Sequence, residues 1–174
     1  MIQKIIDTKD ARLKTKSKEV KSVDKKVLGI VADLVDTLRA QNDPEGVGLA
    51  SPQIGKNLRI FVMEKGKKLL TIINPKVLSV SEVPKAKRGR GTSIMEGCLS
   101  LPNFYTPLVR AAKIKIEYLN EFGQKVFGEF KGLDAQIVQH EIDHLNGITF
   151  LDRMFEQKKP LFEHMNGDWE EVDL

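Results

Sequence analysis

The sequence predicts an α+β fold in which mixed or antiparallel strands surround one central helix, with a second helix near the N-terminus. Two stretches, residues 25–40 and 132–146, carry apolar residues at helical spacing. Residues 113–119 instead alternate apolar and charged side chains, as a half-buried strand does. The 174 residues have the size of one domain and contain no internal repeat or linker. We therefore predict a single domain over residues 1–174.

The N-terminal part should form a Lys-rich arm followed by a helix. We expect residues 1–23 to be irregular and to wrap over the body of the domain. Asp24 or Ser22 can cap a helix over residues 25–40. The residues that should face the core are Val27, Leu28, Val31, Leu34, Val35 and Leu38. Residues 42–46, with the sequence NDPEG, then break the helix.

The middle of the chain should form strands. We expect strands at residues 58–63 and 69–73, with Asn74-Pro75 ending the second. A short strand at residues 77–80 should follow. The basic residues 81–93 contain Gly and Pro and indicate a surface loop.

The second half should contribute three more strands and the central helix. The strands are expected at residues 98–101, 113–119 and 125–130, with a hairpin loop at residues 120–123. The helix over residues 132–146 should end at Asn146-Gly147.

The central helix carries H-E-I-D-H at residues 140–144. Residues four apart lie on the same face of a helix, so His140 and His144 can both bind one metal ion. Glu141 is then placed to contact a water molecule at that ion. A chance pattern on an amphipathic helix is the alternative interpretation.

A third ligand would decide the kind of site. The longer zinc-protease pattern H-E-x-x-H-x-x-G-x-x-H matches as far as Gly147, but Phe150 stands where the last His would be. The only other His is His164, and the only cysteine is Cys98, within E-G-C-L-S at residues 96–100. A thiolate with two imidazoles suits a divalent transition metal and leaves one position open for water. An isolated cysteine is otherwise more often a buried, inert thiol.

Two other functions fit the same helix motif. A metalloprotease would use His140, His144 and Glu141 with a different third ligand, and it would cleave internal peptide bonds. A structural-metal or binding protein would have a closed site. The glutamate beside the two histidines favours an open, reactive position instead.

A third motif completes an ordered set. Residues 46–53, GVGLASPQ, are glycine-rich but fit neither a phosphate loop nor a dinucleotide fingerprint. Together with residues 96–100 and Q-H-E-I-D-H at residues 139–144, they resemble the peptide deformylase family. That family carries G-x-G-L-A-A-P-Q, E-G-C-L-S and Q-H-E-x-D-H in this order. The resemblance covers nearly the whole chain, and Ser51 is a small-for-small departure from the usual second alanine.

The resemblance implies a metal-dependent hydrolase that removes the formyl group from the N-terminal formyl-methionine of newly made proteins, releasing formate. It implies Cys98, His140 and His144 as the ligands of one divalent ion, so that the central helix is a metal-binding helix. Fe(II) is the implied native ion, with Zn, Ni or Co as replacements. The donor set alone does not choose among these ions.

The resemblance also implies roles for the neighbouring residues. Glu141 would act as base and then as acid, and the Gln53 side chain and the Leu99 backbone N–H would stabilise the developing oxyanion. Without the resemblance, Gln53 would be interpreted as a loop residue bonded to its own backbone. The implied substrate-binding residues are Gly46, Val47, Gly48, Leu99 and Ile137. The implied supporting residues behind the ligands are Glu96, Arg110, Gln139 and Asp143, the first two as a buried ion pair.

Composition and charge bear on location and partners. One cysteine fits the reducing cytoplasm, no run approaches the roughly 20 apolar residues of a membrane helix, and the N-terminus lacks a signal-peptide pattern. The net charge is +4, with a basic cluster of Lys85, Lys87, Arg88 and Arg90. We expect a monomer that acts on N-formyl-Met nascent peptides, has at most a weak ribosome contact and does not bind a membrane or a specific nucleic-acid sequence.

The C-terminal residues should not anchor the protein to ribosomes. The resemblance implies that many bacterial members carry a long basic helix in this region for that purpose. Pro160 disfavours helix for the residue before it, and residues 163–174 are acidic. Ribosomal RNA should repel such a segment. Any ribosome contact should use the basic cluster at residues 85–90 instead.

Overall fold

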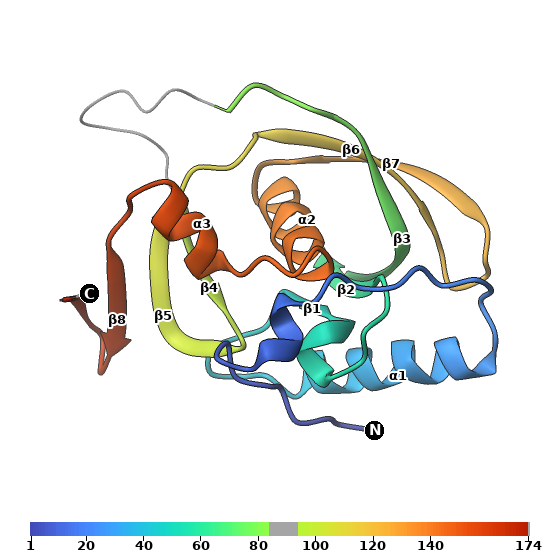
Figure 1. The fold of residues 1–174 in the computed structure, drawn as a ribbon, viewed down its shortest axis with the longest axis horizontal. Helices are drawn as coiled ribbons and strands as arrows, with labels where there is room; N and C mark the ends of the chain where they lie inside the picture. Colours follow the sequence, from blue (N-terminus) through green and yellow to red (C-terminus); the bar gives the residue numbers. More distant parts are fainter. Residues whose placement is uncertain (84–93, 174) are drawn as a thin grey trace.

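The computed structural model describes residues 1–83 and 94–173, which form two antiparallel sheets and three α-helices, with helix α2 at the centre (Figure 1). One sheet has five strands in the order β1-β2-β3-β6-β7, and the other has four in the order β4-β5-β8-β9. The predicted α+β fold is confirmed. None of the helices in the described ranges is long and apolar enough to cross a membrane. The expected loop at residues 81–93, with its basic cluster, lies mostly outside the described residues.

The central helix α2 spans Gly132–Leu145, in close agreement with the prediction. It packs against β1, β2, β6 and β7, and Ala135, Val138 and Leu145 are fully buried in the core that it shares with them. Its polar residues His140, Glu141, Asp143 and His144 are buried as well. Buried polar groups need hydrogen-bond or metal partners. Four such side chains close together on one helix indicate a functional site.

The five-stranded sheet consists of β1 (Gly48–Ala50), β2 (Ile60–Lys65), β3 (Lys68–Val80), β6 (Lys113–Leu119) and β7 (Lys125–Lys131). The expectation that Asn74-Pro75 ends a strand is wrong, because β3 continues through it with a shift of register between Ile73 and Lys76. Asn74 adopts a positive φ of 50°, and its side chain bonds both backbone groups of Val20. The irregularity therefore ties the N-terminal arm to the sheet.

The N-terminal arm contains a short 3-10 helix, η1 (Ala11–Lys14), and leads into α1 (Lys25–Arg39). Asp24 caps α1 by accepting a hydrogen bond from the Val27 N–H at 2.9 Å. The expected inward position of Leu28 is wrong, since this side chain is 40% exposed. Ile30 faces the core in its place, because the buried stripe of α1 runs through Val27, Ile30, Val31, Leu34 and Leu38.

The four-stranded sheet consists of β4 (Ile94–Cys98), β5 (Leu101–Leu108), β8 (Leu161–Met165) and β9 (Asp168–Val172). The expected strand at residues 98–101 is wrong. The chain instead turns at residues 99–100, between β4 and β5, and Cys98 is the last residue of β4. The sequence also did not lead us to expect helix α3 (Phe150–Glu156) or the β8–β9 hairpin. In Figure 1 this hairpin lies on the outer side of β5.

Candidate metal centre

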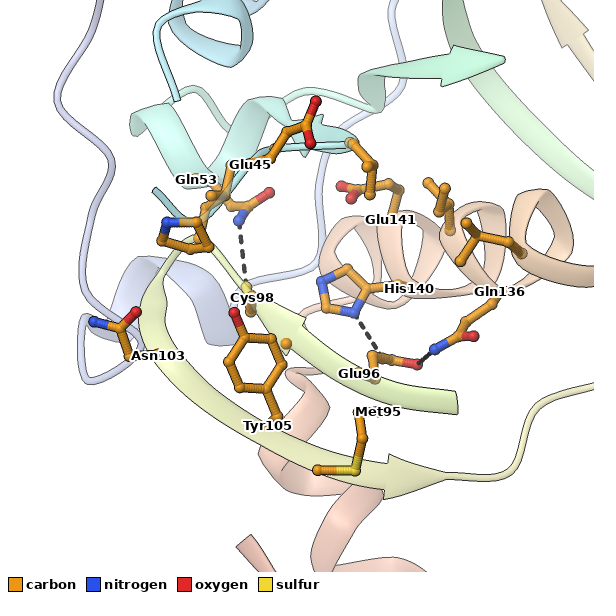
Figure 2. Close-up of a pocket in the computed structure, with 18 residues that line it drawn as sticks. Glu45, Gln53, Met95, Glu96, Cys98, Asn103, Tyr105, Gln136, His140 and Glu141 are labelled. Carbon is orange, nitrogen blue, oxygen red and sulfur yellow. Dashed lines mark hydrogen bonds and ion pairs between the residues drawn. The ribbon is translucent and has the colours of Figure 1, made fainter. Parts of the chain in front are cut away.

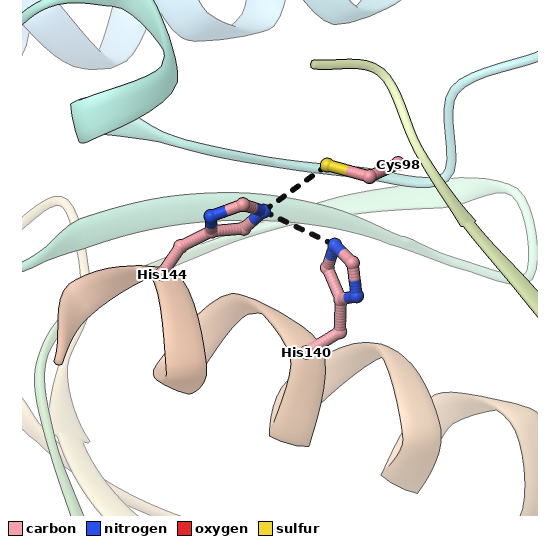
Figure 3. A group of neighbouring side chains, drawn as sticks. All are labelled: Cys98, His140 and His144. Atoms are coloured by element: carbon pink, nitrogen blue, oxygen red, sulfur yellow. Dashed lines mark hydrogen bonds between the residues drawn. The ribbon is translucent and has the colours of Figure 1, made fainter. Parts of the chain in front are cut away.

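Three potential metal ligands converge between α2 and the end of β4. His140 and His144 are one helical turn apart on α2, and Cys98 faces them from β4 (Figure 3). The His144 Nε2 atom lies 3.3 Å from the Cys98 Sγ and 3.2 Å from the His140 Nε2. All three ligand atoms lie within 4.8 Å of one another. One soft thiolate and two imidazoles in this arrangement fit a transition-metal ion with an open coordination position.

The electrostatics of the cluster favour the ligating form of the cysteine. Burial alone would raise the pKa of the Cys98 thiol, but the neighbouring imidazoles of His144 and His140 outweigh it and hold that pKa well below the ordinary value. The thiolate is the form that binds metals. The donor set therefore fits a divalent transition-metal ion in its chemistry as well as in its geometry.

A buried acidic group fixes the orientation of one ligand. The His140 Nδ1 lies 2.7 Å from Glu96 Oε1, which directs the Nε2 of the same ring toward Cys98 and His144. Burial opposes ionisation of Glu96, but hydrogen bonds from His140 and Arg110 lower its pKa far below the ordinary value. Gln136, which the sequence did not single out, also donates to Glu96, at 3.1 Å.

Two arginines extend this network behind the ligands. Arg110 donates to both oxygens of Glu96, at 2.6 and 3.0 Å, as predicted, and to Asp143 Oδ2 at 2.6 Å. Arg153 from α3 completes a bidentate pair with the same Asp143, at 2.7 and 3.0 Å. The network joins β4, α2 and α3. Arg153 was not predicted, because its helix was not recognised in the sequence.

Gln139 has a different position from its sequence neighbours. Its side chain donates to the backbone carbonyls of Ala111 and Ala135 and accepts from the Ala111 N–H. It therefore holds α2 against the segment after β5. Its contacts are therefore with the backbone of Ala111 and of its own helix, and not with a ligand side chain.

Glu141 lies on the pocket side of α2, next to β1. Its Oε2 is buried and has no hydrogen-bond partner among the described residues. Burial raises the pKa of this carboxyl to about 7, although the two neighbouring imidazoles act in the opposite direction. A Cβ atom at Gly48 would lie 2.6 Å from Glu141 Oε1 and 3.0 Å from the Ile137 side chain. Because Gly48 has no side chain, the Glu141 carboxylate can occupy this position.

Gln53 lies in the 3-10 helix η2 (Ser51–Ile54) and is almost fully buried. Its Oε1 accepts a hydrogen bond from the Ala50 N–H at 2.9 Å, which fixes the orientation of the amide. Its Nε2 then faces the site, 3.4 Å from Cys98 Sγ and 3.2 Å from Ser100 Oγ. The side chain is thus a hydrogen-bond donor with a fixed orientation beside the ligands. It also accepts a hydrogen bond from the backbone of its own segment.

A pocket of about 200 Å³ opens beside these groups (Figure 2). It lies between α2, the segment at residues 44–48 and the strands β4 and β5. All five residues expected to bind substrate line it: Gly46, Val47, Gly48, Leu99 and Ile137. Further lining residues that the sequence did not indicate are Met95, Asn103, Tyr105, Leu133 and Gln136. Tyr105 reaches the pocket through the pairing of β5 with β4, which no local sequence pattern reveals.

A thiolate and two buried imidazoles beside a carboxylate, at an open pocket, define the class of metal-dependent hydrolases. Residues 2–160 match the family model described as polypeptide deformylase. The chain belongs to this family. The resemblance drawn from the three motifs is confirmed.

Individual relatives agree with the family match. The peptide deformylase of Pseudothermotoga lettingae is 39% identical over 168 residues, which cover 94% of this chain and 92% of the relative. That of Carboxydothermus hydrogenoformans is 37% identical over 152 residues, covering 87% and 93%. The crystal structure of peptide deformylase from Thermotoga maritima superposes with a TM-score of 0.78 at 34% identity, covering 88% of this chain and 97% of that one. The protein is thus a metal-dependent hydrolase that removes the N-formyl group from newly made proteins.

Proposed function

We propose that Cys98, His140 and His144 hold one divalent metal ion and that Glu141 performs the proton transfers of deformylation. The observation that carries this assignment is the convergence of three ligand atoms within 4.8 Å beside a buried carboxylate oxygen that has no partner in the described structure. When bound, such an ion supplies Lewis acidity, which lowers the pKa of a water molecule and polarises a carbonyl group.

The proton transfers belong to Glu141. This carboxylate accepts a proton from the attacking water and later returns it to the departing amine. Its buried position keeps both transfers away from bulk water. Its pKa of about 7 is close to the neutral range in which a group can work in both directions.

The negative charge that develops on the formyl oxygen needs donors. The Gln53 side-chain amide, held by Ala50, and the Leu99 backbone N–H are the donors that we assign to it. Loss of one such donor typically costs about 2.7–4 kcal/mol of barrier.

The methionine side chain should occupy the apolar part of the pocket. Val47, Leu99 and Ile137 line it, while Gly46 and Gly48 bring the backbone of residues 44–48 close to the substrate. Glu96, Arg110 and Asp143 hold the ligands from behind.

The native ion is proposed to be Fe(II), with Zn, Ni or Co as replacements. The donor set accepts all four, and the family resemblance is what favours iron. Because Fe(II) and a ligating thiolate are both oxidisable, an iron-loaded sample should lose activity in air faster than under nitrogen. A cobalt- or nickel-loaded sample should lose it more slowly than the iron-loaded one.

We further infer that residues 1–174 act as one domain and as a monomer in the cytoplasm, on N-formyl-Met nascent peptides, with at most a weak ribosome contact. The lone cysteine supports a reducing compartment. The basic cluster proposed for the ribosome contact, Lys85, Lys87, Arg88 and Arg90, lies outside the described residues.

A substrate comparison tests the proposed function. Protein purified without oxygen should release formate from formyl-Met-Ala and should leave the internal bonds of an unformylated peptide intact. Cleavage of those bonds without formate release would identify a metalloprotease instead. A bound metal without turnover of either substrate would identify a closed structural site.

A further inference from the structure

One wall of the pocket is formed by an aromatic ring that lies on a glycine. Tyr105 of β5 is paired across the sheet with Gly97 of β4, the residue before the ligand Cys98. A Cβ atom at Gly97 would lie 2.6 and 2.7 Å from two ring carbons of Tyr105. The ring therefore fills the space that the glycine leaves. Figure 2 shows it standing on β5 at the side of the pocket.

A second aromatic ring continues from this wall. Trp169 of β9, the only tryptophan of the chain, packs edge-on against Tyr105 with ring centroids 5.3 Å apart. It also lies 4.6 Å from the ring of His164, its cross-strand partner on β8. Tyr105 is paired with Phe162 of β8, and Phe162 lies on the same face of the strand as His164, two residues along. Tyr105, His164 and Trp169 therefore share one face of the four-stranded sheet. Trp169 remains 49% exposed. We call Tyr105, His164 and Trp169 the aromatic row.

The aromatic row runs from the pocket onto the outer hairpin, beyond the residues that hold the ligands or line the pocket. The family match ends at residue 160, before the hairpin begins. A half-exposed tryptophan held by two rings offers a large apolar contact surface that loses little freedom on binding. The molecule that contacts it should be the substrate that we propose for the pocket at the other end of the row.

We propose that the aromatic row extends the substrate site and that Trp169 determines specificity by contacting apolar side chains of the nascent peptide beyond its first residues. This inference rests on the proposed function. A nascent chain continues past its formylated residue, and an extended chain advances by about 3.3 Å per residue. The 5.3 Å between the two rings corresponds to roughly two residues, so a peptide whose first or second residue lies beside Tyr105 would contact Trp169 with its third or fourth residue.

The proposal is tested by comparing short and long substrates. Trp169→Ala should leave kcat/KM for formyl-Met-Ala within about twofold of the wild type, because the dipeptide ends before the tryptophan. For formyl-Met-Ala-Leu-Leu it should lower kcat/KM about three- to tenfold, mainly through KM, as expected for the loss of one aromatic contact. Formyl-Met-Ala-Ser-Ser should be affected less. An equal loss on all three peptides, or no loss on any, would overturn the proposal.

Two control variants separate contact from folding. Trp169→Phe should restore most of the preference for the leucine peptide, since it keeps an aromatic ring. Met165→Ala changes an exposed side chain of the same hairpin that points to the opposite face, and it should behave like the wild type on all peptides. A Met165→Ala variant that lost the preference as Trp169→Ala does would contradict a specific role for the row.

The lone tryptophan also allows a binding measurement without any change to the hairpin. In metal-loaded Glu141→Gln protein, saturating formyl-Met-Ala-Leu-Leu should shift the Trp169 fluorescence, whereas saturating formyl-Met-Ala should not. An unchanged spectrum with the longer peptide would overturn the proposal. A wild-type protein that releases no formate from formyl-Met-Ala would instead refute the proposed function, so the two failures are distinguishable.

Discussion

At the scale of single residues, Glu141 is the group on which the proposed reaction depends. It is buried, one of its oxygens has no partner in the described structure, and it is not one of the converging ligands. Glu141→Gln should therefore keep the metal content of the wild type and lower kcat about 10²–10⁴-fold, because the amide cannot carry the proton.

Metal analysis and formate release on the same sample measure both effects. Glu121→Gln makes the same change at an exposed position and should have wild-type activity. If the Glu141 variant lost its metal and regained normal turnover on refilling, Glu141 would be a ligand or a structural group and not the base.

At the scale of elements, the network of Glu96, Arg110, Asp143 and Arg153 connects β4, α2 and α3 behind the ligands. Arg110→Met should lower the free energy of unfolding by about 3–5 kcal/mol, because Glu96 and Asp143 are left buried without this partner. Urea unfolding measures the loss. Lys115→Met removes an exposed pair with Glu129 and should leave the midpoint nearly unchanged. If Arg110→Met and Lys115→Met had the same urea unfolding midpoint, the buried network would not stabilise the fold.

The N-terminus of α3 gives a pH-dependent effect. The Asp152 carboxylate accepts hydrogen bonds from Lys14 and from the Thr149 N–H and hydroxyl, which hold its pKa below the ordinary value although burial opposes this. A lowered pKa in the folded state stabilises the fold above the unfolded pKa, and this stabilisation is lost as the pH falls through the folded pKa.

Asp152→Asn should therefore lower the urea midpoint at pH 7 and have a smaller effect near pH 3, close to the ordinary pKa of the carboxyl. Unfolding curves at both pH values check this expectation. A midpoint difference that is the same at both pH values would mean that the carboxylate charge is not responsible.

The spacing of apolar residues in the sequence predicted the helices and strands that this spacing alone determines. Strand β6 was predicted with its observed bounds and α2 to within one residue, because alternation and helical spacing are strong there. The β8–β9 hairpin was missed although Asn166-Gly167, with φ values of 53° and 88°, is a common hairpin turn pair. Its strands carry many acidic residues, which masked the alternation. The end of β4 at Cys98 and the place of Tyr105 depend on strand pairing, which the sequence does not show locally.

At the scale of the whole molecule, the acidic C-terminal residues are a folded edge of the four-stranded sheet and not a free tail. Deletion of residues 166–174 removes β9 with Trp169. Since ribosomal RNA should repel these carboxylates, ribosome co-sedimentation at low salt should be unchanged by the deletion. Turnover of formyl-Met-Ala should also stay near the wild-type value, while turnover of longer apolar peptides falls. A sharp drop in co-sedimentation would show that this segment is the ribosome anchor after all.

Hydrolysis at this site should require one divalent ion, which we propose is held by Cys98, His140 and His144. Anaerobic titration of metal-free protein with Fe(II), with formate release and bound metal measured at each step, tests it most directly. Activity should rise linearly to a plateau at one ion per chain, and Cys98→Ser should need a much higher free metal concentration, because a hydroxyl is a poor replacement for a soft thiolate. Full activity of the metal-free protein would show that the reaction needs no metal ion, and the same metal affinity in the Cys98→Ser variant would show that Cys98 is not a ligand.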